Sequence, residues 1–426
     1  MLLLLRHPER SRPNGGAVEE PFSLMPQQEG ALHYASLGSA SVGMTMWGRS
    51  AKSALLSLAA LAAAIATPAA AQDVRLPVLV PLTGFVALEG TSQRNGAVLA
   101  ASQTSEVVLK PDVLDTQSTP EAAVTAWERA LGGSPVPAVV GPILGTQMLA
   151  LLPLAQERSV PVLTISGTAR LGELGNPWFF RFFPSDATVK VAHARYVVEK
   201  LGAKRPAIIY QSTAYGQSGR EQLARTFGEL KAPPVLEESI APTVNDLAPA
   251  LLRAKNANAD VIVLHLHAAS TVLAVRQARQ LLPDLPIVAG SAMHQPATAA
   301  LLEPAELKGV CAETAASPIS ATTGPMRAFL DSYRAAYKSE PDAFAAAQFD
   351  AVGMLGKIVG DLRKAGQPVT AAAVRDHLAR DTYQGIVTTY RSDGKGNMAH
   401  EAEIVCFDGS DRIPKPTARY AIPSRS

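Results

Sequence analysis

The chain has 426 residues, of which 47% are hydrophobic and 18% charged, with a formal net charge of +2 at pH 7. This near-neutral balance gives no electrostatic reason to bind nucleic acid or an anionic membrane, so we expect neither as a partner. The length exceeds what one compact domain usually holds, and we therefore expect more than one.

A secretion signal precedes the part of the chain that we expect to fold. The apolar run Ala54–Ala66 follows Arg49 and Lys52 and ends before small residues, which is typical of a signal peptide cleaved after Ala71. The run is too short to span a membrane, which takes about 20 apolar residues. We assign residues 44–71 to the signal and expect a periplasmic protein. Residues 1–43 are either a mis-assigned start or an unusual N-terminal extension.

The first predicted element of the mature chain is the apolar strand Leu76–Leu82. It leads through Thr83 and Gly84 into a helix that starts near Thr91. A strand–loop–helix junction of this kind points free backbone N–H groups and the positive end of a helix at whatever lies above the strand. The junction therefore favours a ligand site at the carboxyl end of this strand.

Short apolar strands alternate with amphipathic helices along the rest of the chain. The predicted strands are Val107–Leu114, Ala138–Gly141, Pro161–Ser166, Ala207–Gln211, Asp260–His267 and Pro286–Ala289. The predicted helices are Pro120–Leu131 with Thr119 as its N-cap, Thr146–Glu157, Ala187–Leu201, Gly219–Leu230, Asp246–Lys255 and Ala269–Leu281. Such alternation predicts an α/β fold with parallel sheets covered on both faces.

Several short motifs occur in an order that points to one family. They are Val139–Pro142, Pro153–Ala155, Val160–Val162, Phe180–Asp186, Tyr215–Ser218, Arg276–Arg279, Lys308–Val310, Phe349–Val352, Gln384–Gly385 and Asp393–Gly394. Each motif alone is weak evidence for any family. Taken in order, they resemble the type I periplasmic solute-binding proteins of ABC importers, the leucine/isoleucine/valine-binding protein family.

The resemblance implies two three-layer α/β lobes joined by a hinge with three crossings, which we place near Pro184, Glu313 and Tyr390. Lobe 1 would then comprise residues 72–184 and 314–390, and lobe 2 residues 185–313 and 391–426. In this fold the ligand lies where loops at the carboxyl ends of strands from both lobes face one another. Binding energy then closes the hinge around the solute.

The resemblance also implies a site for a ligand carboxylate. The serine pair that usually holds it is replaced here by Leu144 and Gly145, so only the helix end and Thr146 remain for an anion. Ser166, Gly167 and Thr168 keep the family's hydroxyl-bearing turn. The alternative for these hydroxyls is plain turn and capping chemistry.

Two further positions bear on the nature of the ligand. Tyr215 falls where the family presses an aromatic ring on the solute, with core packing as the alternative. The acid that usually pairs with a ligand ammonium is missing near Ala292 and Met293. Either Glu89 has taken over that pairing from the opposite lobe, or the ligand has no ammonium, because an unpaired buried ammonium would cost several kcal/mol. Glu89 itself could instead be a solvated loop acid.

Histidines and cysteines add two more expectations. His265 and His267 lie two apart on a predicted strand and His294 follows the next one, which favours polar lining of the cleft over a metal site. We expect no metal and no cofactor. Cys311 and Cys406 either form a disulfide in an oxidising compartment or remain two buried small hydrophobic residues.

The sequence lacks the common nucleophile, phosphate-loop, dinucleotide and zinc-protease motifs, and we expect no enzyme. We expect a monomer that binds a small amino-acid-like or carboxylate solute and delivers it to an ABC permease in the inner membrane. The alternatives are a ligand-sensing receptor on the same fold that acts through a signalling partner, and a periplasmic hydrolase.

Overall fold

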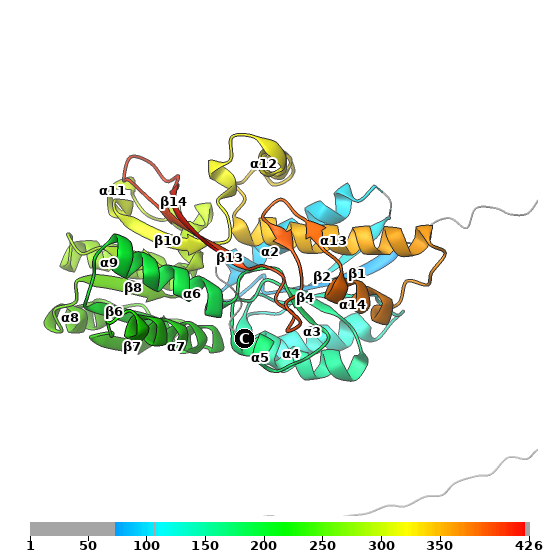
Figure 1. The fold of residues 1–426 in the computed structure, drawn as a ribbon, viewed down its shortest axis with the longest axis horizontal. Coiled ribbons are helices and arrows are strands. Elements are labelled where there is room, and N and C mark those ends of the chain that lie inside the picture. Colours follow the sequence, from blue (N-terminus) through cyan, green and yellow to red (C-terminus); the bar gives the residue numbers. More distant parts are fainter. Residues whose placement is uncertain (1–72, 106, 422–426) are drawn as a thin grey trace, which may run out of the picture. The chain divides into compact units, whose positions relative to one another are not determined.

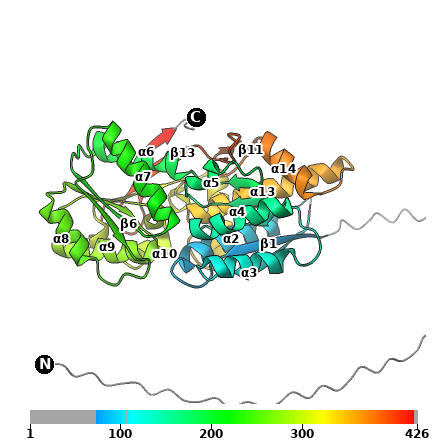
Figure 2. The same ribbon diagram turned by 90° about the horizontal axis from the view of Figure 1, so that it is seen from below.

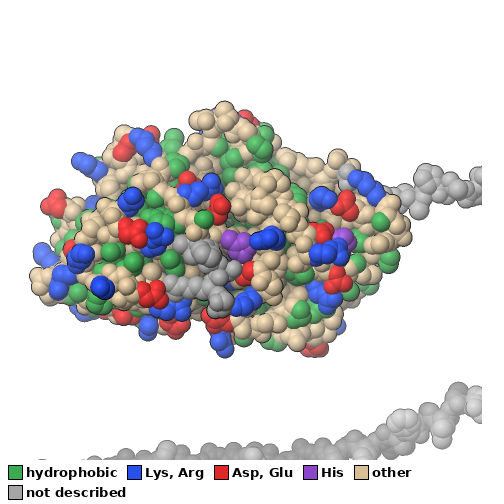
Figure 3. Space-filling model, in the orientation of Figure 1, with side chains coloured by type: hydrophobic (Ala, Val, Ile, Leu, Met, Phe, Trp, Pro, Cys, Tyr) green, Lys and Arg blue, Asp and Glu red, His purple; other side chains and the backbone are tan. Residues whose placement is uncertain are grey.

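The computed structural model describes residues 73–105 and 107–421. The assigned signal, its cleavage site and residues 1–43 lie outside this range. Within it, no helix is both long enough and apolar enough to cross a membrane. On the face shown in Figure 3, acidic and basic side chains are interspersed rather than gathered by sign.

The first sheet has five strands in the order β2-β1-β3-β4-β5, and all its pairings are parallel. Its strands are β1 (Val74–Val80), β2 (Leu109–Asp115), β3 (Val139–Val140), β4 (Val162–Thr164) and β5 (Phe179–Arg181). Alternate residues of β1 face opposite layers: Val78 packs with α2 (Ala87–Gln103) and α13 (Ala343–Lys364), and Leu79 packs with α3 (Pro120–Leu131) and α4 (Gly145–Arg158). The sheet is therefore covered on both faces, as its apolar strands require.

The second sheet has seven strands in the order β14-β13-β10-β9-β8-β6-β7. Its strands are β6 (Pro206–Gln211), β7 (Leu236–Ile240), β8 (Val261–His265), β9 (Ile287–Ala289), β10 (Val310–Thr314), β13 (Glu401–Cys406) and β14 (Lys415–Ala421). One face carries α6 (Asp186–Arg195), its π-helical continuation Tyr196–Lys200, and α7 (Ala214–Glu229). The other carries α8 (Ala248–Asn256), α9 (Ala268–Leu281), α10 (Pro296–Ala299) and α11 (Pro304–Leu307). Figures 1 and 2 show the two sheets in separate bodies that lie side by side.

Three segments of the chain run between the two sheets. Residues 182–185 follow β5, residues 315–323 follow β10, and residues 391–400 precede β13. The chain returns to the first body through α12 (Gly324–Tyr337), α13 and α14 (Ala371–Arg380), and a small hairpin of β11 (Tyr383–Gln384) and β12 (Thr389–Tyr390) precedes the last segment. The fold is thus two α/β lobes with mostly parallel sheets, while the residue limits given above for each lobe stay a prediction.

Most of the predicted elements are present, and the largest errors lie at helix starts. Helix α3 and its cap are as predicted, with the Thr119 hydroxyl accepting the N–H of Ala122 at 3.3 Å. Helix α7 begins five residues earlier than predicted, because the Thr213 hydroxyl accepts the N–H of Gly216 and caps it there. Helix α2 begins at Ala87 rather than near Thr91, and β8 ends at His265 rather than at His267. Strands β5 and β7 and helices α12 to α14 had not been assigned.

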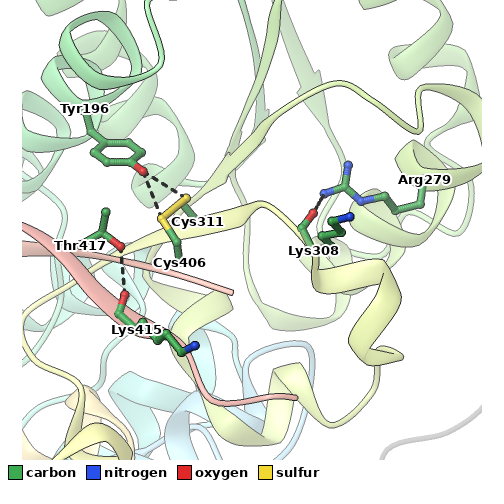
Figure 4. Close-up of a disulfide and its surroundings, with 7 residues drawn as sticks. All are labelled: Tyr196, Arg279, Lys308, Cys311, Cys406, Lys415 and Thr417. Carbon is green, nitrogen blue, oxygen red and sulfur yellow. Dashed lines mark hydrogen bonds between the residues drawn. A yellow bond between two sulfur atoms is a disulfide. The ribbon is translucent and has the colours of Figure 1, made fainter. Parts of the chain in front are cut away.

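The two cysteines are joined in a disulfide (Figure 4). Cys311 of β10 and Cys406 of β13 face each other across an antiparallel pair, with 4.0 Å between their Cα atoms. The hydroxyl of Tyr196 lies 3.5 Å from the sulfur of Cys311 and 3.2 Å from that of Cys406. The bridge therefore ties the segment that follows the last crossing to the centre of the second sheet.

Candidate ligand-binding cleft

A cavity that is partly open to solvent lies between the two lobes. Its wall is formed by residues that follow the carboxyl ends of β1, β3, β4 and β5 on one side and of β6, β8 and β9 on the other. Its polar wall residues are Glu89, Asp186, Tyr215, His267 and Ser291. Its apolar wall residues include Ile143, Ile165, Phe183, Val189, Ala292 and Phe344. Among the described residues, no lysine or arginine lines it.

Glu89 is buried in the first turn of α2, with 1% of its surface exposed, so it is not a solvated loop acid. Its Oε1 accepts the backbone N–H of Ala268 at 2.9 Å, at the start of α9 in the other lobe. The same oxygen lies 3.6 Å from Nδ1 of His267. Its Oε2 has no hydrogen-bond partner in the described part of the chain. One oxygen of this carboxylate is therefore engaged across the cleft and the other is free.

The predicted carboxylate site lies beside the cavity, and only part of it reaches the wall. Gly167 is at the wall, whereas Leu144, Gly145 and Thr146 are not. Leu144 is buried and precedes the first turn of α4, and a Cβ on Gly145 would lie 2.0 Å from Oγ1 of Thr168. The glycine thus leaves room for Thr168 to pack against the helix start.

The hydroxyls of Ser166 and Thr168 are buried, although neither residue is at the cavity wall. Neither hydroxyl has a partner among the described residues. A buried hydroxyl without a partner is costly, and such groups in a native structure call for an explanation, such as an absent water or ligand.

Arg181 holds the loop that carries these hydroxyls, a role that no sequence pattern indicates. Its Nη1 donates to the carbonyls of Ser166, Gly167 and Thr168 at 3.1, 3.1 and 2.7 Å. Burial lowers the pKa of the guanidinium to about 10, although Asp186 opposes that shift, and the group stays charged at neutral pH. Arg181 therefore draws three successive carbonyl oxygens to itself and fixes the turn.

Two histidine rings pack against Tyr215 in tilted contacts at the second-lobe wall. The ring centroid of Tyr215 lies 3.8 Å from that of His265 and 4.9 Å from that of His267. Nε2 of His265 bonds to the backbone oxygen of Tyr215 at 2.9 Å. Burial holds the pKa of the Tyr215 hydroxyl well above its usual value and that of His265 well below it, so both stay neutral at pH 7. Both histidine rings contact Tyr215, although His267 lies beyond the end of β8.

Behind this wall lies a buried charged cluster that had not been selected as a site. Lys190 of α6 pairs with Oε1 of Glu313, and Nδ1 of His193 lies 2.9 Å from Oε2 of Glu313. Burial opposes ionisation of Glu313, but Lys190 and His193 outweigh it and hold its pKa below the usual range. Burial raises the pKa of Asp186 to about 6, with Lys190 acting against the rise. Oδ2 of Asp186 has no partner in the residues described.

His294 does not line the cavity but contacts the other lobe. Its Nδ1 donates to the carbonyl of Ser291, which leaves Nε2 unprotonated. Nε2 accepts the N–H of Ala343, the first residue of α13, at 2.9 Å. Residues 73–105 and 107–421 contain no group of three His, Cys, Asp or Glu side chains placed to hold a metal ion.

Two α/β lobes with a cavity at facing strand ends define the architecture of a two-lobed protein, a class in which ligand sites lie between the lobes. The family model described as periplasmic binding protein matches residues 73–411. The chain belongs to this family, as a type I member of the leucine/isoleucine/valine-binding group.

Individual relatives are distant. The chain is 26% identical over 245 residues to the Leu/Ile/Val-binding protein BraC3 of Rhizobium johnstonii, a match that covers 55% of this chain and 66%, just under two thirds, of that protein. It has the fold of the LivJ branched-chain amino acid transporter substrate-binding protein of Streptococcus pneumoniae in complex with isoleucine, at a TM-score of 0.72 and 23% identity over 82% of this chain and 99% of that one. A solute-binding protein of an ABC transporter from R. palustris in complex with 4-hydroxybenzoate gives a TM-score of 0.73 at 15% identity, over 82% and 98%.

Proposed function

We propose that this protein is the substrate-binding component of an ABC importer and that it binds a small amino-acid-like or carboxylate solute between its lobes. The observation that carries the proposal is a set of buried polar groups without partners in and beside one inter-lobe cavity. They are Oε2 of Glu89, Oδ2 of Asp186, and the hydroxyls of Ser166 and Thr168. Glu89 and Asp186 are at the wall, where a polar solute would supply partners for Oε2 and Oδ2, while Ser166 and Thr168 lie behind the wall on either side of Gly167.

The cavity favours a solute that carries an ammonium group. Glu89 and Asp186 enter its wall from opposite lobes, and no lysine or arginine is among the residues described at the wall. An ammonium offers three donors to such acceptors. The turn from Ser166 to Thr168, which reaches the wall at Gly167, remains for the carboxylate of the same solute. An acid without an amino group, the other possibility for the ligand, would bring a third negative charge toward these two carboxylates.

The remaining parts of the proposal follow from the family. A periplasmic solute-binding protein is exported, and we keep cleavage after Ala71 as the expected processing site. The closed form is then recognised by a permease in the inner membrane, and the protein acts as a monomer without catalysis. The binding chemistry makes and breaks no covalent bond.

A thermal-shift screen of amino acids, aromatic and aliphatic carboxylates and neutral sugars tests the binding proposal. A ligand at 100 times its dissociation constant adds about 2.7 kcal/mol to the free energy of unfolding. We expect stabilisation by amino acids or carboxylates, followed by a calorimetric affinity for the best solute. Stabilisation by neutral sugars alone, or turnover of the bound solute, would contradict the proposal. Loss of uptake of that solute in cells that lack the protein tests the transport role.

A further inference from the structure

Each of two helices that face the cleft has its first backbone N–H capped from the opposite lobe. Helix α9 of the second lobe begins at Ala268, whose N–H is bound by Glu89 of the first lobe. Helix α13 of the first lobe begins at Ala343, whose N–H is bound by His294 of the second lobe. The two contacts are reciprocal, because each lobe supplies one helix start and one acceptor.

Helix α9 depends on the other lobe for this cap. Its N-cap residue, His267, makes no side-chain cap, and its first turn carries no acid. The N–H of His267 is bound by Oε1 of Gln211 at 2.7 Å, within the same lobe. Glu89 brings both an acceptor and a negative charge to the positive end of the helix, which stabilises a helix start. The ring of Phe85 in the first lobe also makes an edge contact with the ring of His267, at 5.6 Å between centroids.

Helix α13 receives a second cross-lobe contact beside its first N–H. Its own cap, Asp342, accepts the N–H of Ala345 at 2.9 Å through Oδ1. Oδ2 of the same residue accepts from Nε2 of Gln295 in the other lobe at 2.7 Å. His294 and Gln295 therefore lie together over the start of α13. Both are buried, at 3% and 0% exposure.

We propose that these reciprocal caps, Glu89 on α9 and His294 on α13, are the latch that holds the cleft closed. The proposal rests on the proposed function, in which a hinge opens and closes around a solute. When the lobes separate, the N–H groups of Ala268 and Ala343 lose their protein acceptors and are left to water. Each cap therefore favours the closed form whatever the solute is. Glu89 and His294 act as positioning residues, which hold the two lobes together around the cavity.

The test measures the distance between the lobes directly. Spin labels are placed at Gln103→Cys on α2 and Gln280→Cys on α9, both exposed sites, in a chain whose described cysteines are paired. Double electron–electron resonance then reports the populations at short and long distance, without solute and with L-leucine or 4-hydroxybenzoate as probes. Glu89→Ala and His294→Ala each remove one cap. Glu89→Gln and His294→Gln keep an acceptor oxygen in reach of the same N–H.

We expect each alanine variant to lower the ratio of closed to open populations about fivefold, which is the typical effect of losing one helix cap. The glutamine variants should recover most of that ratio. Thr119→Ala removes the cap of α3 within one lobe and is the matched control. It should lower the melting temperature without changing the distance distribution.

Unchanged distance distributions in both alanine variants would overturn the latch. So would a wild-type protein that stays at the long distance with and without either probe. The proposed function fails separately, if no amino acid or carboxylate stabilises the folded wild-type protein. In that case the solute-free distance measurement still decides whether the caps hold the lobes together.

Discussion

Replacement of Glu89 by glutamine separates the two classes of solute that the cleft can hold. The glutamine oxygen can still accept the N–H of Ala268, so the contact across the cleft is kept. Its amide nitrogen then stands where Oε2 was, which puts a neutral donor in place of a charged acceptor. The variant therefore changes the charge of the cavity wall without changing its shape.

The size of the effect follows from the burial of this carboxylate. Glu89 is 1% exposed and its Oε2 has no partner among the residues described, so solvent does not screen it. Two unit charges 4 Å apart attract by about 4 kcal/mol at an effective dielectric constant near 20. Broken desolvated pairs cost about 2–5 kcal/mol in measured interfaces. For a solute with an ammonium group, Glu89→Gln should therefore weaken binding by a factor between roughly 30 and several thousand.

Titration calorimetry with the best solute from the screen measures the affinities of the wild-type protein and of Glu89→Gln, and so shows which class of solute binds. If that solute is an acid without an amino group, Glu89→Gln should leave its affinity unchanged or improve it, because a repulsion is removed. Thr168→Ala should weaken binding in either case, since it removes a buried hydroxyl beside the cavity. Glu157→Gln, at an exposed acid of α4, is the control that should change nothing. Normal affinity in both cleft variants would refute the assignment of this cavity as the binding site.

Three other changes test the structure around the cleft. Because burial raises the pKa of Asp186 to about 6, binding of an ammonium-bearing solute should weaken as pH falls, by about tenfold between pH 7 and pH 5, as calorimetry would show. Asp186→Asn should abolish this dependence; a wild-type affinity that rises on acidification would contradict the reasoning. Replacing Cys311 and Cys406 together by alanine opens a link between residues 95 apart and should lower the free energy of unfolding by roughly 2–5 kcal/mol in a urea titration. Gly216→Ala puts a Cβ 1.7 Å from the backbone oxygen of Gln211 and should cost about 1–3 kcal/mol in the same assay, whereas wild-type stability would show that the start of α7 can shift.

The order of helices and strands could be predicted because it depends on local patterns. The near-continuous apolar runs indicated buried parallel strands, and Thr119 indicated the start of α3, since capping acts within a few residues. The start of α7 was predicted at Gly219, five residues too late, although Thr213 stands directly before the true start. In the structure it is the N–H of Gly216 that Thr213 caps, and the close approach of Gln211 leaves no room for a side chain there.

The cleft could be predicted only in part, because its polar groups meet across long stretches of chain. Tyr215, His267, Gly167 and Glu89 were selected and line the cavity. Asp186 was not selected, although it lies at the start of a predicted helix, where an acid is ordinarily read as favourable to the helix dipole. Asp186 differs from an ordinary acid at a helix start only in its burial and its unpaired oxygen, and neither property can be predicted from the sequence.

Helix starts without a cap of their own carry information that sequence analysis seldom uses. Helix α3 of the first lobe and helix α7 of the second each begin after a threonine that caps them, so the start of each is capped within its own lobe. Helix α9 begins after a histidine that makes no cap, and its first N–H is satisfied by an acid 179 residues away. Because buried backbone N–H groups are almost always paired, a missing local cap on a buried helix implies an acceptor from elsewhere in the fold. In a protein built to open and close, that acceptor can belong to the other lobe, and the uncapped helix start then marks a place where the lobes meet.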